Sequence, residues 1–288
     1  MDLCFRMGPA RLWQLMILPP FFLLAALLSL VIAGCAPAQL VLPQGPGTAY
    51  PGYSSLFDSV VSECRRIRTY EAMIAVRGRG GNRNFRGRVR AGLAAPGSVR
   101  LEGLAPFGAP GFYLVATPAE AILWLTREGR VLTDVPAGDM LAGLTGIPFG
   151  PEDLRAVLTG CLVPDPQPMR GRSYGEWVVV ELMGGAVAYL RPTEDTYRLV
   201  AGTRDGLTIE YGSYRRNIPT MVRIFSNDLG DDRETTPSLD VTASLSQLNL
   251  NVELESGTFF LSVPADVSPM TLEDLRQAGP LRAKQDPL

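Results

Sequence analysis

Cys35 is the residue whose type and position point most clearly to chemistry. The chain begins with a short cationic stretch that contains Arg6 and Arg11, and residues 12–31 are largely apolar and interrupted by Pro19-Pro20. Small residues then precede the cysteine. This is the order of the n-region, h-region and cleavage site of an exported protein, so residues 1–34 are predicted to be a signal peptide.

The segment Val31-Ile32-Ala33-Gly34-Cys35 resembles the bacterial lipobox, whose cysteine becomes the acylated first residue of the mature protein. The resemblance implies that Cys35 carries lipid and tethers an exported domain to a membrane. The alternative is an uncleaved transmembrane helix, for which the apolar run is nearly long enough. Ala36, rather than Asp, follows the cysteine, and by the enterobacterial sorting rule this favours the outer membrane, facing the periplasm.

The composition excludes most catalytic classes. Histidine is absent, which removes the commonest general base and the commonest metal ligand. No Gly-x-Ser-x-Gly elbow, phosphate-binding glycine loop or His-Glu-x-x-His motif occurs. The formal net charge is only −2, and Lys284 is the only lysine. We therefore expect a protein that is not an enzyme, with no cofactor and no metal site.

An arginine-rich segment, Arg77-Gly78-Arg79-Gly80-Gly81-Asn82-Arg83, looks like an RGG-type nucleic-acid element. Exported lipoproteins rarely meet nucleic acid, and Gly80-Gly81-Asn82 lies between two alternating stretches, which is typical of a hairpin turn. We expect a hairpin and no nucleic-acid partner. Its arginines could touch anionic headgroups or cargo.

Two cysteines, Cys64 and Cys161, remain in the mature chain beside the anchor residue. They are too few and too far apart in sequence for a thiolate metal site. Two possibilities stay open at this point: a disulfide formed in an oxidising periplasm, or two buried free thiols.

The mature chain divides into three parts. Residues 35–53 are rich in Pro and Gly and read as a lipidated cysteine with a flexible tether. Residues 54–265 form the predicted domain, which opens with an amphipathic helix up to about Thr69. Residues 266–288 are predicted to be a C-terminal tail that is weakly helical at most.

The domain reads as mainly β. Arginines at 86, 88 and 90 alternate with apolar or small residues, as in an antiparallel strand with one wet face, and roughly a dozen short strands follow this style. Two short helices are predicted within residues 138–160, where Pro151 and the acidic residues after it make a good helix start. A strongly curved antiparallel sheet that wraps towards a barrel, covered by short helices around an apolar cavity, is the expected architecture. The alternative is a space completely filled by side chains.

A resemblance to a known family rests on several short matches. Leu144-Thr145-Gly146-Ile147-Pro148-Phe149, followed by Leu154-Arg155 and Leu158-Thr159-Gly160, resembles a signature of LolB, the outer-membrane receptor for lipoproteins. Leu104 to Gly108 is similar to the Pro-Leu-Gly loop of that family, Tyr211-Gly212-Ser213-Tyr214 to its Tyr-Gly-Gly-Tyr strand, and Pro219 to the proline that opens the next strand. The segment from Val241 onward departs from LolB and looks more like the ending of the broader LolA-like carrier superfamily.

The resemblance implies an unclosed half-barrel with a helical lid and a cavity for acyl chains. The loop Pro106-Phe107-Gly108 falls where LolB has a protruding apolar residue that helps to deliver cargo into the membrane; the alternative is Phe107 tucked into the sheet edge. Cys64 on the first helix and Cys161 beside the lid could meet where both cover the barrel, which favours a disulfide. The candidate cavity lining from the strands is Phe85, Val89, Leu101, Val115, Ile122, Trp124, Ile209, Tyr211 and Met221. The candidate lid residues are Leu141, Leu144, Ile147, Leu154 and Leu158.

The sequence thus predicts a monomeric, lipid-anchored protein that binds acyl chains and receives or inserts lipoproteins at the outer membrane. The implied partners are lipoproteins or their acyl chains, membrane lipid and a periplasmic LolA-like carrier. Two alternatives stay open: a LolA-like lipoprotein that serves as a periplasmic interaction or sensor module, and a carrier of another lipid.

Overall fold

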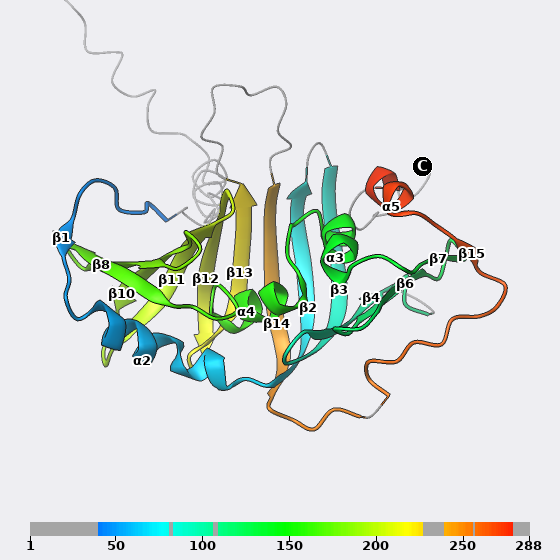
Figure 1. Ribbon diagram of the computed structural model, residues 1–288, viewed down its shortest axis with the longest axis horizontal. Helices are drawn as coiled ribbons and strands as arrows, with labels where there is room; N and C mark the ends of the chain where they lie inside the picture. Colours follow the sequence, from blue (N-terminus) through cyan, green and yellow to red (C-terminus); the bar gives the residue numbers. More distant parts are fainter. Residues whose placement is uncertain (1–39, 81–82, 106–108, 227–238, 256, 279–288) are drawn as a thin grey trace, which may run out of the picture. The chain divides into compact units, whose positions relative to one another are not determined.

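The computed structural model describes residues 40–80, 83–105, 109–226, 239–255 and 257–278. The chain divides after Val41, and the unit Leu42–Leu288 is compact. Every helix and strand named below, and the one disulfide found, lie in the second unit (Figure 1).

Fifteen strands of the described residues form one unclosed sheet, in the order β1-β8-β9-β10-β11-β12-β13-β14-β2-β3-β4-β5-β6-β7-β15. All neighbours are antiparallel except β15, which pairs with β7 in parallel. The predicted fold class, a mainly β protein with a single unclosed sheet and short helices, is confirmed. The strands are β1 (Thr48–Ala49), β2 (Thr69–Gly80), β3 (Arg83–Ala94), β4 (Ser98–Leu104), β5 (Phe112–Ala116), β6 (Ala121–Leu125), β7 (Arg130–Leu132), β8 (Pro168–Tyr174), β9 (Trp177–Leu182), β10 (Val187–Pro192), β11 (Tyr197–Arg204), β12 (Leu207–Arg215), β13 (Ile218–Ser226), β14 (Leu239–Leu250) and β15 (Ser268–Pro269).

Three helices, α2 (Tyr53–Arg66), α3 (Ala137–Thr145) and α4 (Pro151–Thr159), lie on the same face of this sheet (Figure 1). α2 packs on β8, β9 and β11, whereas α4 packs on β13, β3 and β4. α4 begins at Pro151, and the Asp153 carboxylate accepts a hydrogen bond from the backbone N–H of Gly150 at 3.1 Å. It ends at Gly160, whose φ of +85° favours glycine. We call the face under these helices the inner face and the opposite one the outer face.

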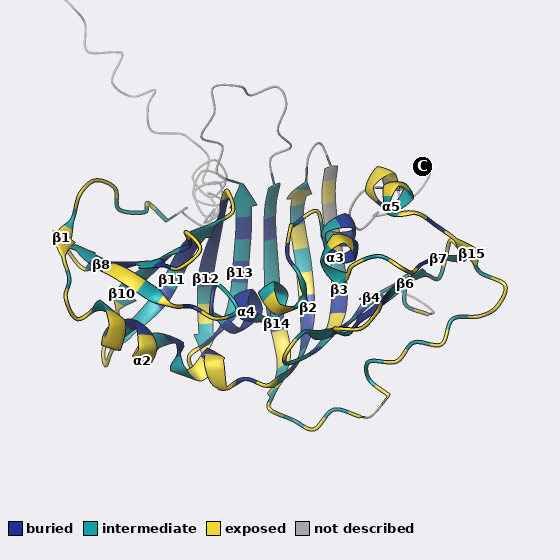
Figure 2. Cartoon of the chain, in the orientation of Figure 1, coloured by how far each residue is buried: buried dark blue, intermediate teal, exposed yellow. Residues whose placement is uncertain are grey.

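The pattern of buried residues follows the register of the sheet. On the inner face Ala72 lies opposite Ala91 and Ile74 opposite Val89, and all four are buried. The arginines that alternate with them at 86, 88 and 90 are exposed, as the sequence pattern predicted. Figure 2 shows that buried residues gather where the helices meet the sheet. Side chains of the helices and of the inner face form one apolar core.

Both ends of the domain lie beyond the predicted boundaries. β1 pairs with β8, and the backbone N–H of Tyr50 donates to Gly171 O at 3.0 Å, so part of the predicted tether is in the sheet. At the other end β15 and α5 (Leu272–Ala278) follow, α5 packs on α3, and Leu275 is buried. Residues 266–278 therefore belong to the domain and not to a tail. Such short elements give too few periods for a sequence pattern to reveal them.

After β14 the chain runs along the outer face, and we call its described residues, 251–255 and 257–262, the outer strap. Thr69 Oγ1 donates to Val252 O at 2.6 Å, and Arg100 Nη1 donates to Thr258 O and Phe260 O, both at 3.1 Å. Residues 259–261 form no strand, and the Phe260 carbonyl is bound by an arginine side chain instead of a neighbouring strand.

Candidate functional site

The inner face of the sheet is the candidate site. Four of the predicted cavity residues, Val89, Leu101, Ile209 and Tyr211, are buried there. The backbone of Phe85 continues the same row, since it lies opposite Gly78, and its side chain is outside the described residues. This row of buried apolar side chains continues across the neighbouring strands of the sheet. Its largest fully buried strand residues are Tyr70, Leu93, Leu114, Leu123, Leu132, Leu182, Leu190 and Ile209.

Three predicted cavity residues, Val115, Ile122 and Trp124, lie on the outer face instead. Val115 is paired with Arg100 and with Ile122, and the Trp124 ring stacks on Tyr113 at 5.6 Å between centroids. The inner positions of β5 and β6 belong to their neighbours, such as Leu114 and Leu123. Both strands are apolar on both faces, so the sequence shows no alternation from which to choose the buried face.

Met221 is also on the outer face, for a related reason. It pairs with Gly212, and its side chain fills the space in which a Gly212 side chain would lie. Its neighbour Val222 is the fully buried inner residue of β13. A methionine beside a small residue is apolar whichever way it points, so the pattern could not fix its direction.

The cover segment, residues 133–167, crosses the inner face and carries α3 and α4. It connects β7, near one edge of the sheet, with β8, near the other. Four predicted lid residues, Leu141, Leu144, Ile147 and Leu158, are buried, and Leu154 is half-buried against the core. The predicted lid is therefore a strap over the full width of the sheet.

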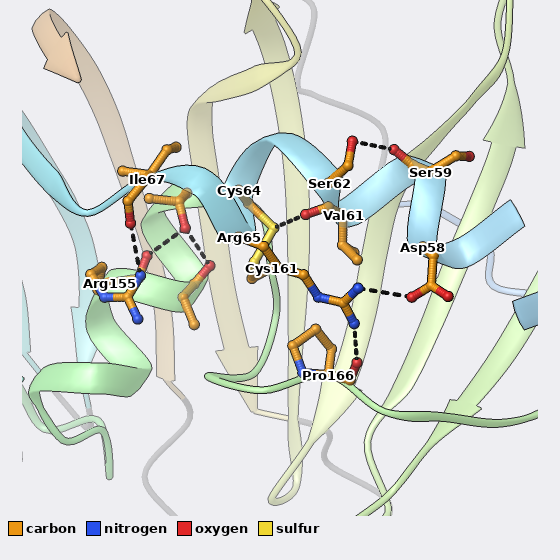
Figure 3. Close-up of a disulfide and its surroundings, with 12 residues drawn as sticks. Asp58, Ser59, Val61, Ser62, Cys64, Arg65, Ile67, Arg155, Cys161 and Pro166 are labelled. Atoms are coloured by element: carbon orange, nitrogen blue, oxygen red, sulfur yellow. Dashed lines mark hydrogen bonds and ion pairs between the residues drawn. A yellow bond between two sulfur atoms is a disulfide. The ribbon is translucent and has the colours of Figure 1, made fainter. Parts of the chain in front are cut away.

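Cys64 of α2 and Cys161 of the cover segment form a disulfide, with their Cα atoms 5.6 Å apart (Figure 3). Polar contacts flank it on both sides. Arg155 Nη1 donates to Ile67 O at 3.2 Å, and Arg65 Nη2 donates to Pro166 O at 2.6 Å while its Nη1 pairs with Asp58 at 2.8 Å. Burial lowers the pKa of Arg155. The disulfide and these contacts join α2 and α4 into one layer.

Arg204, at the end of β11, binds the cover segment from the sheet. Its guanidinium pairs with Asp153 of α4 at 2.8 Å, donates to Leu162 O at 3.2 Å, and lies over the Phe149 ring at 5.2 Å. Burial lowers the pKa of Arg204, but hydrogen bonds to Asp205 and Asp153 outweigh this and raise it. Sequence reasoning missed this residue, because nothing in its strand distinguishes it from the other exposed-looking arginines.

The inner face is apolar with few polar atoms. The Tyr70 hydroxyl is buried and has no hydrogen-bond partner among the described residues. Burial raises the pKa of Tyr70 and of Tyr211, which also lies on this face. A buried hydroxyl without a hydrogen-bond partner lowers the stability of the fold unless a ligand supplies that partner.

The space over the inner face is occupied by side chains of the helices. Phe57 and Val61 of α2, Met140 of α3 and Val157 of α4 are fully buried in the same core as the strands. A hollow of about 860 Å³ lies where the cover segment, at Val135, Ala137 and Pro151, meets the sheet at Ala121, and one of about 640 Å³ lies under the outer strap. Helix side chains therefore fill the space over these strand residues, as in the alternative of a filled space, and an open apolar cavity large enough for acyl chains stays a prediction.

Some predicted site residues cannot be placed. Cys35 and the loop Pro106, Phe107 and Gly108 lie outside the described residues. Within the part of the chain that is described, no group of three or more His, Cys, Asp or Glu could hold a metal ion. None of its helices is long and apolar enough to span a bilayer.

The fold and this face define a class: an unclosed antiparallel sheet whose apolar face is covered by helices. No family model and no curated protein matches the sequence. Among solved structures, the chain is similar to a LolA superfamily protein from Nitrosomonas europaea, at 12% identity and a TM-score of 0.49 over 72% of this chain and 98% of the other. It is also similar to a DUF1329 family protein from Desulfovibrio piger, at 11% identity and a TM-score of 0.46 over 71% of this chain and 95% of the other. A candidate outer membrane lipoprotein-sorting protein domain from Vibrio parahaemolyticus has 13% identity and a TM-score of 0.44 over 67% of this chain and 89% of the other.

Proposed function

We propose that this protein is a membrane-tethered lipoprotein that binds acyl chains on its inner face and receives or inserts lipoproteins at the outer membrane. One observation carries the proposal. A wide apolar sheet face is covered not by further strands but by three short helices, two of them on a single connecting segment. Helices that make no strand-type backbone pairing with the sheet can move away without breaking it.

Acyl chains suit the surface that such a movement would uncover. The inner face offers apolar side chains from at least ten strands, and the buried Tyr70 hydroxyl provides a donor for an ester oxygen. Transfer of an acyl chain from water contributes about 0.8 kcal/mol per buried CH₂. A bound chain would replace the helix side chains that now pack on the sheet, so cargo binding and cover displacement would be coupled.

The direction of transfer is part of the proposal. A lipidated Cys35 would hold the domain at the membrane, and the loop Pro106-Phe107-Gly108 would enter the lipid interface beside it. Cargo would come from a soluble LolA-like carrier, by passage from one apolar face to another. No covalent step is needed, so the protein would act without catalysis and without a cofactor.

The filled inner face favours a second candidate, an interaction or sensor module in which the cover stays in place. Arg204 and the disulfide hold α4 on the sheet and on α2, as a permanently closed domain requires. In that case a periplasmic partner would bind the outside of the domain. A carrier of another lipid differs from the first proposal only in its cargo.

Native mass spectrometry of the unit Leu42–Leu288, purified gently with its disulfide intact from a membrane-containing host, tests the proposal. We expect an acyl-bearing mass that leaves on denaturation, and uptake of an acylated lipoprotein in preference to a phospholipid. Preference for phospholipid would identify another lipid carrier. A clean protein mass with no uptake of either would contradict the proposal and favour the interaction module.

A further inference from the structure

The outer face of the β2–β3 hairpin carries three arginines that form no ion pair with another described residue. Arg77 on β2 lies directly opposite Arg86 on β3, and Arg88 lies two residues further along β3 on the same face. All three are exposed, and Figure 2 shows exposed stretches at the hairpin end of these strands. We call Arg77, Arg86 and Arg88 the hairpin arginine cluster. Like charges opposite each other destabilise a sheet, so local folding does not explain their presence.

The carboxylates near the cluster already bind other arginines. Glu102 pairs with Arg90 at 3.2 Å and with Arg100 at 2.7 Å. Asp240 accepts two hydrogen bonds from Arg223, each of 2.9 Å.

Asp240 also interacts electrostatically with two arginines outside the cluster. The hydrogen bond from Arg223, together with the charges of Arg223 and Arg79, lowers the pKa of Asp240 in spite of its partial burial. Within the described part of the chain, none of the three cluster arginines forms an ion pair. The cluster therefore has positive charge to offer to a ligand.

The outer strap leaves this part of the face open. It crosses the half of the β2–β3 pair that lies away from the hairpin, where Met73, Arg90, Thr258 and Phe260 line the 640 Å³ hollow. The cluster begins beyond that hollow, towards Gly80. A flat surface of two paired strands is thus available to a flat partner.

We propose that the hairpin arginine cluster binds the anionic headgroup layer of a membrane. The guanidinium fork matches the oxygens of a phosphate better than an ammonium does, and every cation of the cluster is an arginine. A flat array of forks without a pocket fits a surface of many phosphates rather than one small ligand. Single-stranded nucleic acid is less suitable, because its binding sites place aromatic side chains among the cations and none lies in the cluster. The proposal does not depend on acyl-chain binding by the inner face.

Vesicle co-sedimentation with the unit Leu42–Leu288, which contains every described helix and strand, tests this. The vesicles contain phosphatidylcholine alone or mixed with phosphatidylglycerol. The cluster variant Arg77→Gln/Arg86→Gln/Arg88→Gln is compared with a control of equal charge, Arg66→Gln/Arg68→Gln/Arg215→Gln, whose exposed positions lie at the end of α2, just before β2 and at the end of β12.

We expect the wild type to prefer anionic vesicles, with weaker binding as salt rises. The cluster variant should lose roughly 100-fold in partition coefficient, at about fivefold per arginine, whereas the control should lose less than about fivefold in total. The lysine variant Arg77→Lys/Arg86→Lys/Arg88→Lys keeps the charge but not the fork, so it should bind anionic vesicles less tightly than the wild type and more tightly than the cluster variant, which separates a charge effect from misfolding.

Three results would overturn the proposal. The first is equal binding of the wild type to neutral and anionic vesicles. The second is an equal loss in the cluster and control variants, which would show an effect of net charge alone. The third is tighter binding to a single-stranded RNA than to anionic vesicles, which would assign the cluster to nucleic acid.

Discussion

At the scale of single residues, the sequence located inner-face positions only where polar and apolar residues alternate. In β3 the arginines marked the wet face, so Val89 was correctly placed inside. In β5 and β6 no polar residue marks either face, and Val115, Ile122 and Trp124 were assigned to the wrong one. Arg204 could not be recognised, since its partners Asp153 and Leu162 come from a distant segment.

Burial of tyrosines makes the fold sensitive to alkali. Burial raises the pKa of Tyr70, Tyr211 and Tyr214, so the folded protein retains phenolic protons that the unfolded chain releases above about pH 10. Their contribution is complete below that pH and is lost as pH rises towards the folded-state values. We expect the free energy of unfolding to fall by about 1.4 kcal/mol per pH unit for each such tyrosine.

Tyr70→Phe separates this effect from general alkaline damage. At pH 7 the variant should be as stable as the wild type or more so, because the hydroxyl that it removes has no hydrogen-bond partner among the described residues. Above pH 10 its urea-unfolding free energy should fall less steeply, by about 1.4 kcal/mol per pH unit. Parallel slopes for the two proteins would show that Tyr70 titrates in the folded state.

At the scale of elements, the helices that cover the sheet were predictable and the ends of the domain were not. Capping signals at Pro151 and Gly160 mark α4 plainly. β15 and the N-terminal β1 have two residues each, and their pairing depends on distant strands. The sequence left open whether Cys64 and Cys161 form a disulfide or stay free thiols. They form a disulfide because α2 and the cover segment meet over the same sheet.

The disulfide is expected to stabilise the folded domain and to restrain its cover. Its cysteines are 97 residues apart, and closing a loop of that length is worth about 4 to 5 kcal/mol in the chain-entropy model. Cys64→Ser/Cys161→Ser should lower the free energy of unfolding by about that amount in urea titrations, and it should bind acyl probes faster.

Reduction of the wild type supplies the matched control, because it opens the same bond without changing the sequence otherwise. The reduced wild type and the double serine variant should show the same free energy of unfolding and the same rate of acyl-probe binding. A stability equal to that of the oxidised wild type would show that the polar contacts of Arg155, Arg65 and Arg204 hold the cover by themselves.

At the scale of the whole molecule, the strand count and the unclosed sheet follow from short alternating segments separated by turns. The order of the strands does not. The jump from β7 at one side to β8 at the other is made by the cover segment, and no local pattern reports that this segment spans the sheet. The same is true of the filled inner face, since packing depends on how helices and strands meet.

The most direct test of the account is the place at which an acyl chain binds. A palmitoyl analogue with a photoreactive group would be bound to the unit Leu42–Leu288, activated, and mapped by mass spectrometry of the peptides. We predict cross-links to inner-face residues such as Val180, Ile209 and Tyr211 and to the facing helices α2 and α4. Cross-links confined to apolar outer-face residues, such as Trp124, Met221 and Phe260, or no specific cross-link at all, would contradict the claim that the inner face binds acyl chains.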